Sequence, residues 1–240
     1  MVTYALILAN TIVFMYQLTL SQPELHRLML LGGVVPVRWG HPDWAQAVGF
    51  PPAGLLPFFS SMFLHGGFWH LLSNMWILFI FGDNVEDRMG HFRFSVFYLA
   101  MGLLAGVAHT LTELTSVVPT IGASGAIAGV LGAYLVLYPR SRVLTVIPIF
   151  FYPLFLELPA FVFLGVWFLT QLLAGTMSAG GGAVGGVAWW AHIGGFIAGI
   201  VLHRFFLRRQ WVDPVTVDAH SGQRVLIIDP ERESRWPEER

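Results

Sequence analysis

The chain contains no cysteine and no lysine, and charged residues make up only 11% of its 240 positions. Without cysteine, a disulfide framework, a thiolate zinc site and a cysteine nucleophile are all excluded. The formal net charge of −1 argues against a nucleic-acid partner. Apolar residues are abundant instead, at 55% of the chain with a mean hydropathy of +0.66. A soluble domain of this length cannot bury so much apolar surface, so we expect most of the chain to face lipid.

Six apolar runs are long enough to cross a bilayer, which takes about 20 helical residues. They lie near residues 2–20, 67–85, 92–112, 122–138, 154–174 and 188–207. The fourth is short unless its helix begins within the Gly-Ala-Ser-Gly string itself. The first run lacks a basic segment before it and a small-residue cleavage site after it, so we expect a retained helix rather than a signal peptide. The sequence predicts an all-α membrane protein, with six transmembrane helices in a domain over residues 1–207.

Two segments lie outside these runs. Residues 21–66 are rich in proline and aromatic residues and too interrupted to span a membrane, and Trp39, Trp44 and Phe50 suit the membrane interface. Residues 208–240 are polar and charged. We expect this second segment to be a cytoplasmic tail, with a small hairpin around Ser221 and Gly222.

The arginines are distributed unevenly between the two sides of the predicted bundle. Only Arg27 and Arg38 lie in the loops after the first, third and fifth runs. The loops after the second and fourth runs and the start of the tail carry Arg88, Arg93, Arg140, Arg142, Arg204, Arg208 and Arg209. Because basic loops stay in the cytoplasm, both termini are predicted to be cytoplasmic. The second, fourth and sixth runs then begin at the outer face.

Four polar residues fall within the first turns of those three runs: His70, Asn74, Ser124 and His192. His70 and Asn74 are four residues apart and share a helical face. Polar side chains are unfavourable in lipid, so a common depth for all four predicts one shared site near the outer face. By contrast, His109, Gln171 and Asn10 are expected to be packing partners, and His65 a loop residue.

Small residues explain how these side chains can meet. They line one face of the fourth and sixth runs: Gly125, Ala128, Gly129 and Gly132, and then Gly195 and Gly199 beside His192. Such faces let two helix backbones approach closely, so that the short side chain of Ser124 reaches an imidazole. Ser124 and His192 would be a nucleophile and its general base. His70, Asn74 and the Ser124 N–H would stabilise an oxyanion. No acidic residue lies near these helix ends, which favours a dyad over a triad.

Each feature also has a simpler interpretation. Glycine pairs mostly serve helix packing, a serine at a helix start is often an N-cap, His70 and Asn74 could bond to other helices, and His192 could serve a proton pathway. Rival enzyme classes lack their residues, because there is no HExxH zinc motif and no pair of aspartates within the runs for an aspartyl intramembrane protease. The string "GASGA" has alanine where a hydrolase elbow needs glycine. No metal or cofactor is expected.

Three motifs together resemble the rhomboid intramembrane serine proteases: "HGGFWHLLSNMWILFIFGDNVEDRMG", "GASGAIAGVLGAY" and "AHIGGFIAG". Their order and spacing match the family over essentially all of residues 1–207. The resemblance implies a six-helix bundle that cleaves membrane-anchored proteins in or near their transmembrane segments. It implies Ser124 as the nucleophile, His192 as the base, and His70 with Asn74 on the oxyanion side. It also implies a membrane-embedded first loop, a capping loop before the sixth helix, and a side gate at the fifth.

One departure from the family concerns the base. Many members place an aromatic residue against the catalytic histidine at the position of Ala128. Another contact must therefore orient His192, and Trp189, Trp190 and backbone groups are the candidates.

The expected function is a serine endopeptidase acting on transmembrane substrates through an acyl-enzyme, in a bacterial inner membrane with its site toward the outer face. The alternative is a catalytically silent relative that binds client helices. A small transporter is a third reading, and it would need polar residues across the full depth of the bundle.

Overall fold

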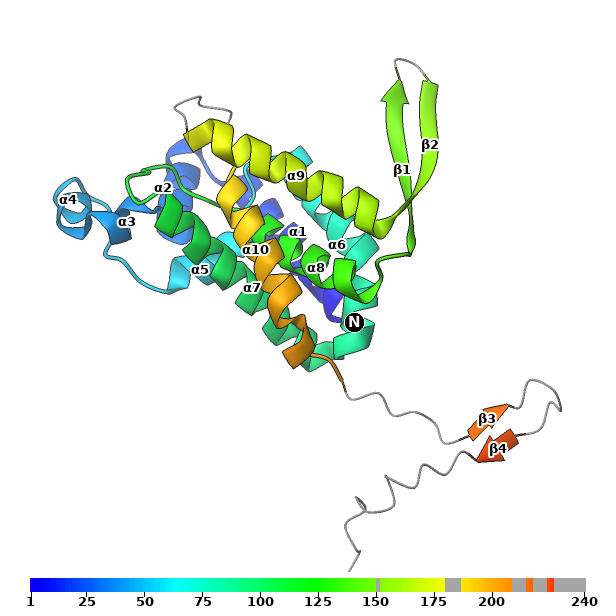
Figure 1. Cartoon of the computed structure of the whole chain (residues 1–240). Helices are drawn as coiled ribbons and strands as arrows, with labels where there is room; N and C mark the ends of the chain where they lie inside the picture. The colour runs from blue at the N-terminus through cyan, green and yellow to red at the C-terminus, as the bar shows by residue number, and fades with distance from the viewer. Residues whose placement is uncertain (150–151, 180–186, 209–214, 218–223, 227–240) are drawn as a thin grey trace, which may run out of the picture. The chain divides into compact units, whose positions relative to one another are not determined.

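A computed structural model of the whole chain describes residues 1–149, 152–179, 187–208, 215–217 and 224–226 (Figure 1). The chain divides into two compact units, Met1–Leu207 and Arg208–Arg240. The helices of the first unit are α1 (Val2–Thr19), α2 (Gln22–Gly32), α3 (Val37–Gly40), α4 (Pro42–Ala47), α5 (Leu56–Ser60), η1 (Ser61–Phe63), α6 (Phe68–Met89), α7 (His91–Thr112), α8 (Ser124–Leu137), α9 (Ala160–Ala179), α10 (Trp189–Leu202) and η2 (His203–Phe205). In the second unit, β3 (Val215–Val217) pairs antiparallel with β4 (Arg224–Leu226), as the hairpin prediction required. The predicted turn itself lies outside the described residues.

A helix occupies most of each predicted apolar run, but the helices differ in length. Three of them, α1, α7 and α9, are long and apolar enough to cross a membrane by length and composition. Helix α8 has 14 residues and α10 also has 14. At 1.5 Å per residue each is about 21 Å long, shorter than a hydrocarbon core of about 30 Å. The six-span count therefore stays a prediction.

The segment between α1 and α6 is folded rather than a loose connection. The buried Arg38 guanidinium donates from Nε to the carbonyl of Pro51 at 3.0 Å and from Nη2 to that of Pro52. Burial lowers the pKa of Arg38. A two-residue bridge joins this segment to the chain just before α8, because Val34 and Thr120 exchange backbone hydrogen bonds at 3.0 and 2.8 Å. The segment between α1 and α6 therefore holds in place the chain that leads into Ser124.

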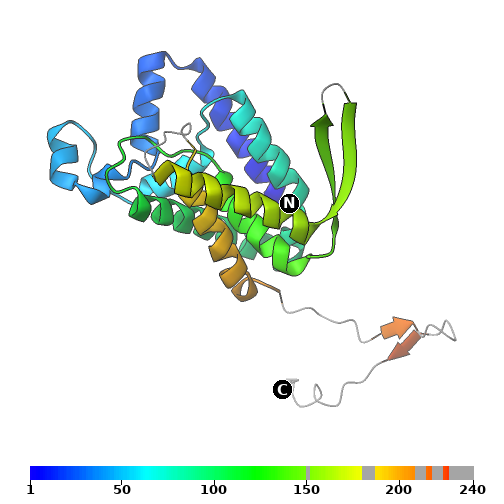
Figure 2. The same cartoon turned by 45° about the horizontal axis from the view of Figure 1, so that its top comes forward.

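Helix α8 forms the centre of the first unit. Its residues 125–134 are all buried, and it packs against α6, α7, α9 and α10. Figures 1 and 2 show α8 among these helices. A helix with no polar face and many glycines and alanines suits this position, since it can be approached on every side.

The contact between α8 and α10 is a backbone contact. An added Cβ at Gly195 would overlap the carbonyl oxygen of Gly125, and one at Gly199 would overlap that of Gly129. A glycine of α8 also contacts the backbone of α10, because a Cβ added at Gly132 would overlap the carbonyl oxygen of Phe196. The predicted small-residue faces therefore do meet, and only glycine permits this separation.

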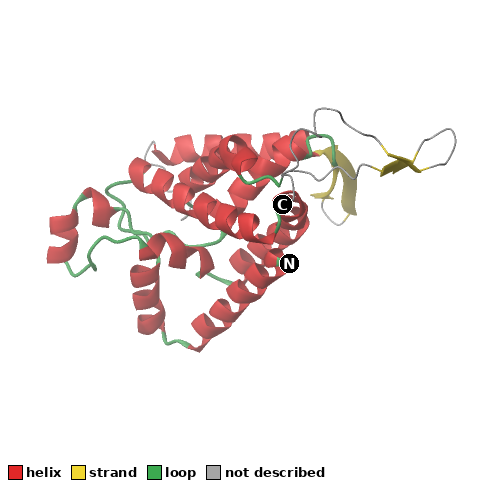
Figure 3. Ribbon diagram, turned by 90° about the horizontal axis from the view of Figure 1, so that it is seen from below, coloured by secondary structure: helices red, strands yellow, loops and turns green. Residues whose placement is uncertain are grey.

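An unpredicted hairpin connects α8 to α9. Strand β1 (Arg142–Ile149) pairs antiparallel with β2 (Tyr152–Pro159), with Arg142 opposite Pro159. Figures 1 and 2 show it projecting from the helices, and Figure 3 distinguishes the strands in yellow from the helices in red. The all-α prediction is wrong here, and the helix of the fifth run, α9, begins at Ala160, later than the predicted run at 154–174. Apolarity alone does not separate strand from helix, whereas the β-branched residues and repeated prolines of 142–159 disfavour a helix.

Replacing Gly199 by alanine should destabilise the protein, because the new methyl group has no space against the α8 backbone. Gly165, in the interior of α9, is a matched control since no heavy atom lies within 4 Å of its added Cβ. We expect Gly199→Ala to lose about 1–3 kcal/mol, and Gly165→Ala to be neutral or to gain up to about 1 kcal/mol from helix propensity. Thermal unfolding in mild detergent measures both. Equal midpoints for the two variants would contradict the close contact.

Candidate active site

Ser124 lies at a sharp entry into α8. Gly122, two residues earlier, has φ of +120°, a conformation that residues with a side chain rarely adopt. Its N–H donates to the carbonyl of Ser61 at 2.8 Å, which fixes the turn against η1. Ala123 is the N-cap residue and makes no side-chain cap bond, while Ser124 is already the first helical residue. The interpretation of Ser124 as a helix cap is therefore wrong, and its hydroxyl is directed elsewhere.

The partner of that hydroxyl is His192, in the first turn of α10. His192 Nε2 lies 2.8 Å from Ser124 Oγ, a hydrogen-bond distance. The two residues are 68 positions apart, and the glycine contact between α8 and α10 brings them together. The structure thus joins the serine and histidine that the sequence pattern paired.

His70 and Asn74 approach the same place from α6. His70 Nδ1 accepts a hydrogen bond from the Gly66 N–H at 3.3 Å, which leaves Nε2 as the protonated nitrogen. A Cβ added to Gly122 would lie 2.7 Å from that Nε2 and 3.6 Å from Asn74 Nδ2. Two donors on one face of α6 therefore flank the turn that leads into Ser124.

The Asn74 amide is an unusual donor. Its Nδ2 is buried and has no hydrogen-bond partner among the described residues. Buried donors are nearly always paired, because an unpaired one loses its hydration without replacement. This unpaired donor lies beside the Gly122 turn that leads into Ser124, and an unpaired donor is what an oxyanion site needs before its ligand arrives.

His65 is a loop residue, as expected, and it supports His70. Its backbone is held by Gln17 of α1, which donates to the His65 carbonyl at 2.9 Å and accepts from the His65 N–H at 3.0 Å. The two imidazole rings meet edge to face with centroids 5.1 Å apart. Burial, together with the neighbouring His70, lowers the pKa of His65 to about 4, so His65 is neutral at physiological pH.

The prediction that Gln171 is a packing partner is wrong, because its side chain contacts His192. Its Oε1 lies 2.8 Å from His192 Nδ1, on the opposite side of the ring from Ser124. The Trp167 ring lies beside the imidazole with centroids 6.1 Å apart, and Trp189 meets the imidazole edge to face at 6.3 Å. The sequence held one signal for Gln171, since it is an amide within an apolar run and buried amides need partners.

The predicted lid before α10 lies partly outside the described residues, at 180–186. Its first residues, including Gly175, belong to α9 instead of a loop.

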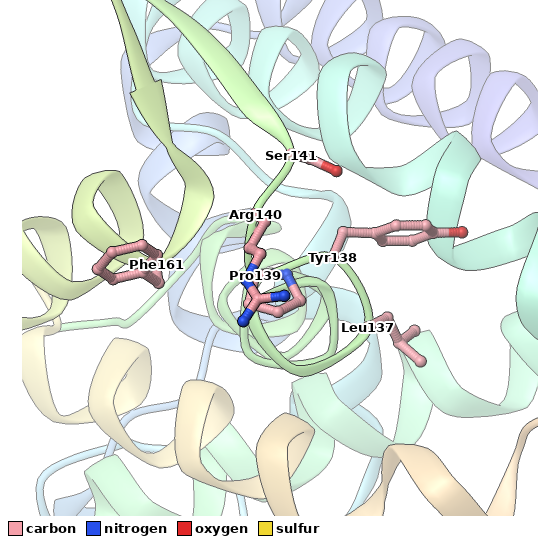
Figure 4. Close-up of a pocket in the computed structure, with 6 residues that line it drawn as sticks. All are labelled: Leu137, Tyr138, Pro139, Arg140, Ser141 and Phe161. Carbon is pink, nitrogen blue, oxygen red and sulfur yellow. The ribbon is translucent and has the colours of Figure 1, made fainter.

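Two pockets lie at opposite ends of α8, and they differ in size and in the side chains that line them. A small one of about 20 Å³, enough for one water molecule, adjoins Ser124, Gly125 and Ala105. A wider one of about 570 Å³ lies at the other end of α8, at the base of the β1–β2 hairpin (Figure 4). Its lining is Leu137, Tyr138, Pro139, Arg140, Ser141 and Phe161. The wider pocket holds no serine–histidine pair, so we place the candidate site at Ser124 despite the size of the other pocket.

A half-buried serine lies within hydrogen-bond distance of a histidine inside a bundle of apolar helices, which is an arrangement that serine hydrolases use. Residues 52–209 match the family model of the Rhomboid domain, and the chain belongs to the rhomboid family. The family match and the apolar helices together identify the chain as a membrane protein.

Several curated relatives support this membership. Rhomboid protein 1, mitochondrial, of Saccharomyces cerevisiae is 31% identical over 147 residues, 59% of this chain and 39% of that protein. A Bacillus subtilis protein named as a candidate rhomboid protease is 38% identical over 76 residues, 32% of this chain and 38% of that protein. The rat presenilin-associated rhomboid-like protein, mitochondrial, is 28% identical over 203 residues, 81% of this chain and 46% of that protein.

These alignments cover less than half the length of each relative. Other relatives are Arabidopsis proteins. Because most of them are mitochondrial or plant proteins, the expectation of a bacterial inner membrane gains no support from them.

Gly122→Ala should disturb the site more than the fold. The substitution places a side chain on a backbone with positive φ and sets its methyl group against His70 Nε2. We expect labelling by a serine-reactive fluorophosphonate to fall at least about tenfold, with a loss of about 1–3 kcal/mol in stability from backbone strain. Gly67→Ala is the control, since its added Cβ meets nothing within 4 Å. Unchanged labelling of Gly122→Ala would show that the Gly122–His70 contact is dispensable.

Proposed function

We propose that this rhomboid-family chain is an intramembrane serine endopeptidase, with Ser124 as nucleophile and His192 as general base. The observation that carries the proposal is the 2.8 Å separation of Ser124 Oγ and His192 Nε2. A serine hydroxyl is a poor nucleophile until a base at this distance accepts its proton. Its substrates would be membrane-anchored proteins, cleaved in or near their transmembrane segments, as the family resemblance implies.

The reaction uses this pair twice. Ser124 Oγ attacks the carbonyl carbon of the scissile peptide while its proton passes to His192 Nε2, and the carbonyl oxygen becomes an oxyanion. The C–N bond then breaks as Nε2 protonates the leaving amine, which leaves an ester on Ser124. Water attacks this ester with Nε2 again accepting the proton, and the returned proton restores the Ser124 hydroxyl. No metal or cofactor takes part in these steps.

The oxyanion would be held by donors from two helices. The candidates are Asn74 Nδ2 and His70 Nε2 from α6, and the Ser124 N–H, which has no intrahelical acceptor because it lies in the first turn of α8. The unpaired state of Asn74 Nδ2 supports this assignment. Fixed donors in a dry site stabilise developing charge without having to reorient during the reaction.

The depth of the site follows from helix length. If the inner end of α8 is level with the inner membrane boundary, its length of about 21 Å leaves Ser124 about 10 Å below the outer boundary. We extend the proposal to six spans with both termini on the arginine-rich side, which is the cytoplasm in a bacterial inner membrane. A substrate helix must unwind to react, since the carbonyls of an intact helix are already hydrogen-bonded.

Covalent labelling tests the dyad without knowledge of the substrate. The purified protein in mild detergent is treated with a fluorescent fluorophosphonate, beside Ser124→Ala and His192→Ala. Labelling of the wild type should fall at least about 1,000-fold in both variants. Thermal unfolding confirms that each variant is folded. A folded wild type that stays unlabelled, in detergent and after return to lipid, would instead favour the catalytically silent helix-binding alternative.

Asn74→Ala should slow cleavage of a transmembrane reporter protein by about 100-fold, mainly in kcat, because the lost donor acts on the transition state. Asn84→Ala is a matched control on the same helix, since its amide donates to the Ile80 carbonyl instead. Cleavage measured on gels in reconstituted vesicles distinguishes the two. Equal loss in both variants would mean that Asn74 acts through the stability of α6.

A further inference from the structure

The imidazole of a serine–histidine pair works only in one tautomer and one orientation. Nε2 must be unprotonated and must face the serine, so the second nitrogen, Nδ1, must carry the proton. The position that supplies an aromatic neighbour in many family members is Ala128 here. We propose that Gln171 is the positioning residue for His192 and holds it in the reactive tautomer. This inference rests on the proposed function and deepens it.

The direction of each hydrogen bond supports this role. Gln171 Nε2 donates to the Trp167 carbonyl at 3.3 Å and lies 3.1 Å from Thr170 Oγ1, so the amide nitrogen points along α9. Oε1 is left to face His192 Nδ1 at 2.8 Å. A carbonyl oxygen only accepts, so Nδ1 must donate and Nε2 is left free to accept the Ser124 proton.

The surroundings make this bond effective. Gln171 is 6% exposed, so little water competes for its oxygen, and hydrogen bonds strengthen in a medium of low polarity. When His192 accepts the Ser124 proton, the positive charge spreads over both ring nitrogens. The Gln171 oxygen then lies next to the Nδ1–H of the imidazolium, as a neutral counterpart of the carboxylate in a triad.

Helix α9 supports the ring as well as its nitrogen. Trp167 and Gln171 are four residues apart and share one face of α9, and the Trp167 ring lies beside the imidazole at 6.1 Å and 35°. These two contacts come from the helix next to α10, whereas the absent aromatic at residue 128 would have come from α8. The base therefore belongs to α10, the nucleophile to α8 and the orientation of the base to α9.

Two substitutions of Gln171 separate an acceptor role from a packing role. Gln171→Met keeps the length and volume of the side chain but removes the acceptor oxygen. Gln171→Glu keeps an oxygen acceptor of the same reach, in either protonation state. Leu164→Ala is the packing control, because Leu164 is fully buried on the same helix and belongs to the apolar core.

Two measurements are made on the full chain in mild detergent. The first is the rate of fluorophosphonate labelling, which should fall about tenfold in Gln171→Met and stay within about threefold of the wild type in Gln171→Glu and Leu164→Ala. The second is the ¹⁵N NMR spectrum of histidine-labelled protein, with the His192 signals assigned by their loss in His192→Gln. The wild type and Gln171→Glu should show protonation at Nδ1, and Gln171→Met should show a mixture with the other tautomer.

The outcomes separate the two proposals. Wild-type protein that resists labelling overturns the proposed function. Wild-type protein that is labelled, beside Gln171→Met labelled at the same rate and with the same tautomer, overturns the positioning role and leaves the dyad intact. A slow Gln171→Met that Gln171→Glu fails to rescue, with the wild-type tautomer in both, also overturns it, because the loss would then be one of packing.

Discussion

The direct contact of two helix backbones, between the glycines of α8 and those of α10, is the constraint on which the site depends. Gly195 and Gly199 lie against the carbonyls of Gly125 and Gly129, and any side chain there would push the helices apart. A serine side chain is short, so even a small separation would break the 2.8 Å contact with His192. The packing that buries α8 and the chemistry proposed for Ser124 are therefore consequences of the same contact.

The other elements complete what this contact begins. The positive φ of Gly122 turns the chain into α8 and leaves room for His70. The unpaired Asn74 amide lies beside this turn, while Gln171 reaches His192 from the far side of the ring. Charge-bearing groups are absent from these contacts within the described residues. The proposed site therefore relies on neutral donors and acceptors, which are less unfavourable in a membrane than ions.

The central pairing could be predicted from sequence because it rests on periodicity and depth. Ser124, His192, His70 and Asn74 recur at equivalent positions of three apolar runs, and the glycine faces follow from helical spacing. Gln171 could not be predicted in the same way, because a single amide in an apolar run does not say which helix it faces. Its partner follows from how α9 packs on α10, which local sequence does not encode.

The largest error in the predicted fold is the missed β1–β2 hairpin, and local sequence is again the reason. Residues 142–159 are almost as apolar as a membrane span, and hydropathy does not distinguish a hairpin from a helix. The proline content of the segment was the stronger signal, since Pro148, Pro153 and Pro159 interrupt any helix through it. Helix α10 ends at Leu202, before the end of the predicted run at 207, for another reason: where a helix ends depends on tertiary contacts as much as on its apolar run.

The most direct test of the central claim is an experimental structure of the protein after reaction with a fluorophosphonate. The account predicts a covalent bond from Ser124 Oγ to phosphorus. It also predicts that the phosphoryl oxygen accepts hydrogen bonds of about 2.7–3.1 Å from Asn74 Nδ2 and the Ser124 N–H. Phosphorus bonded to another residue, or a phosphoryl oxygen pointing away from α6, would contradict it.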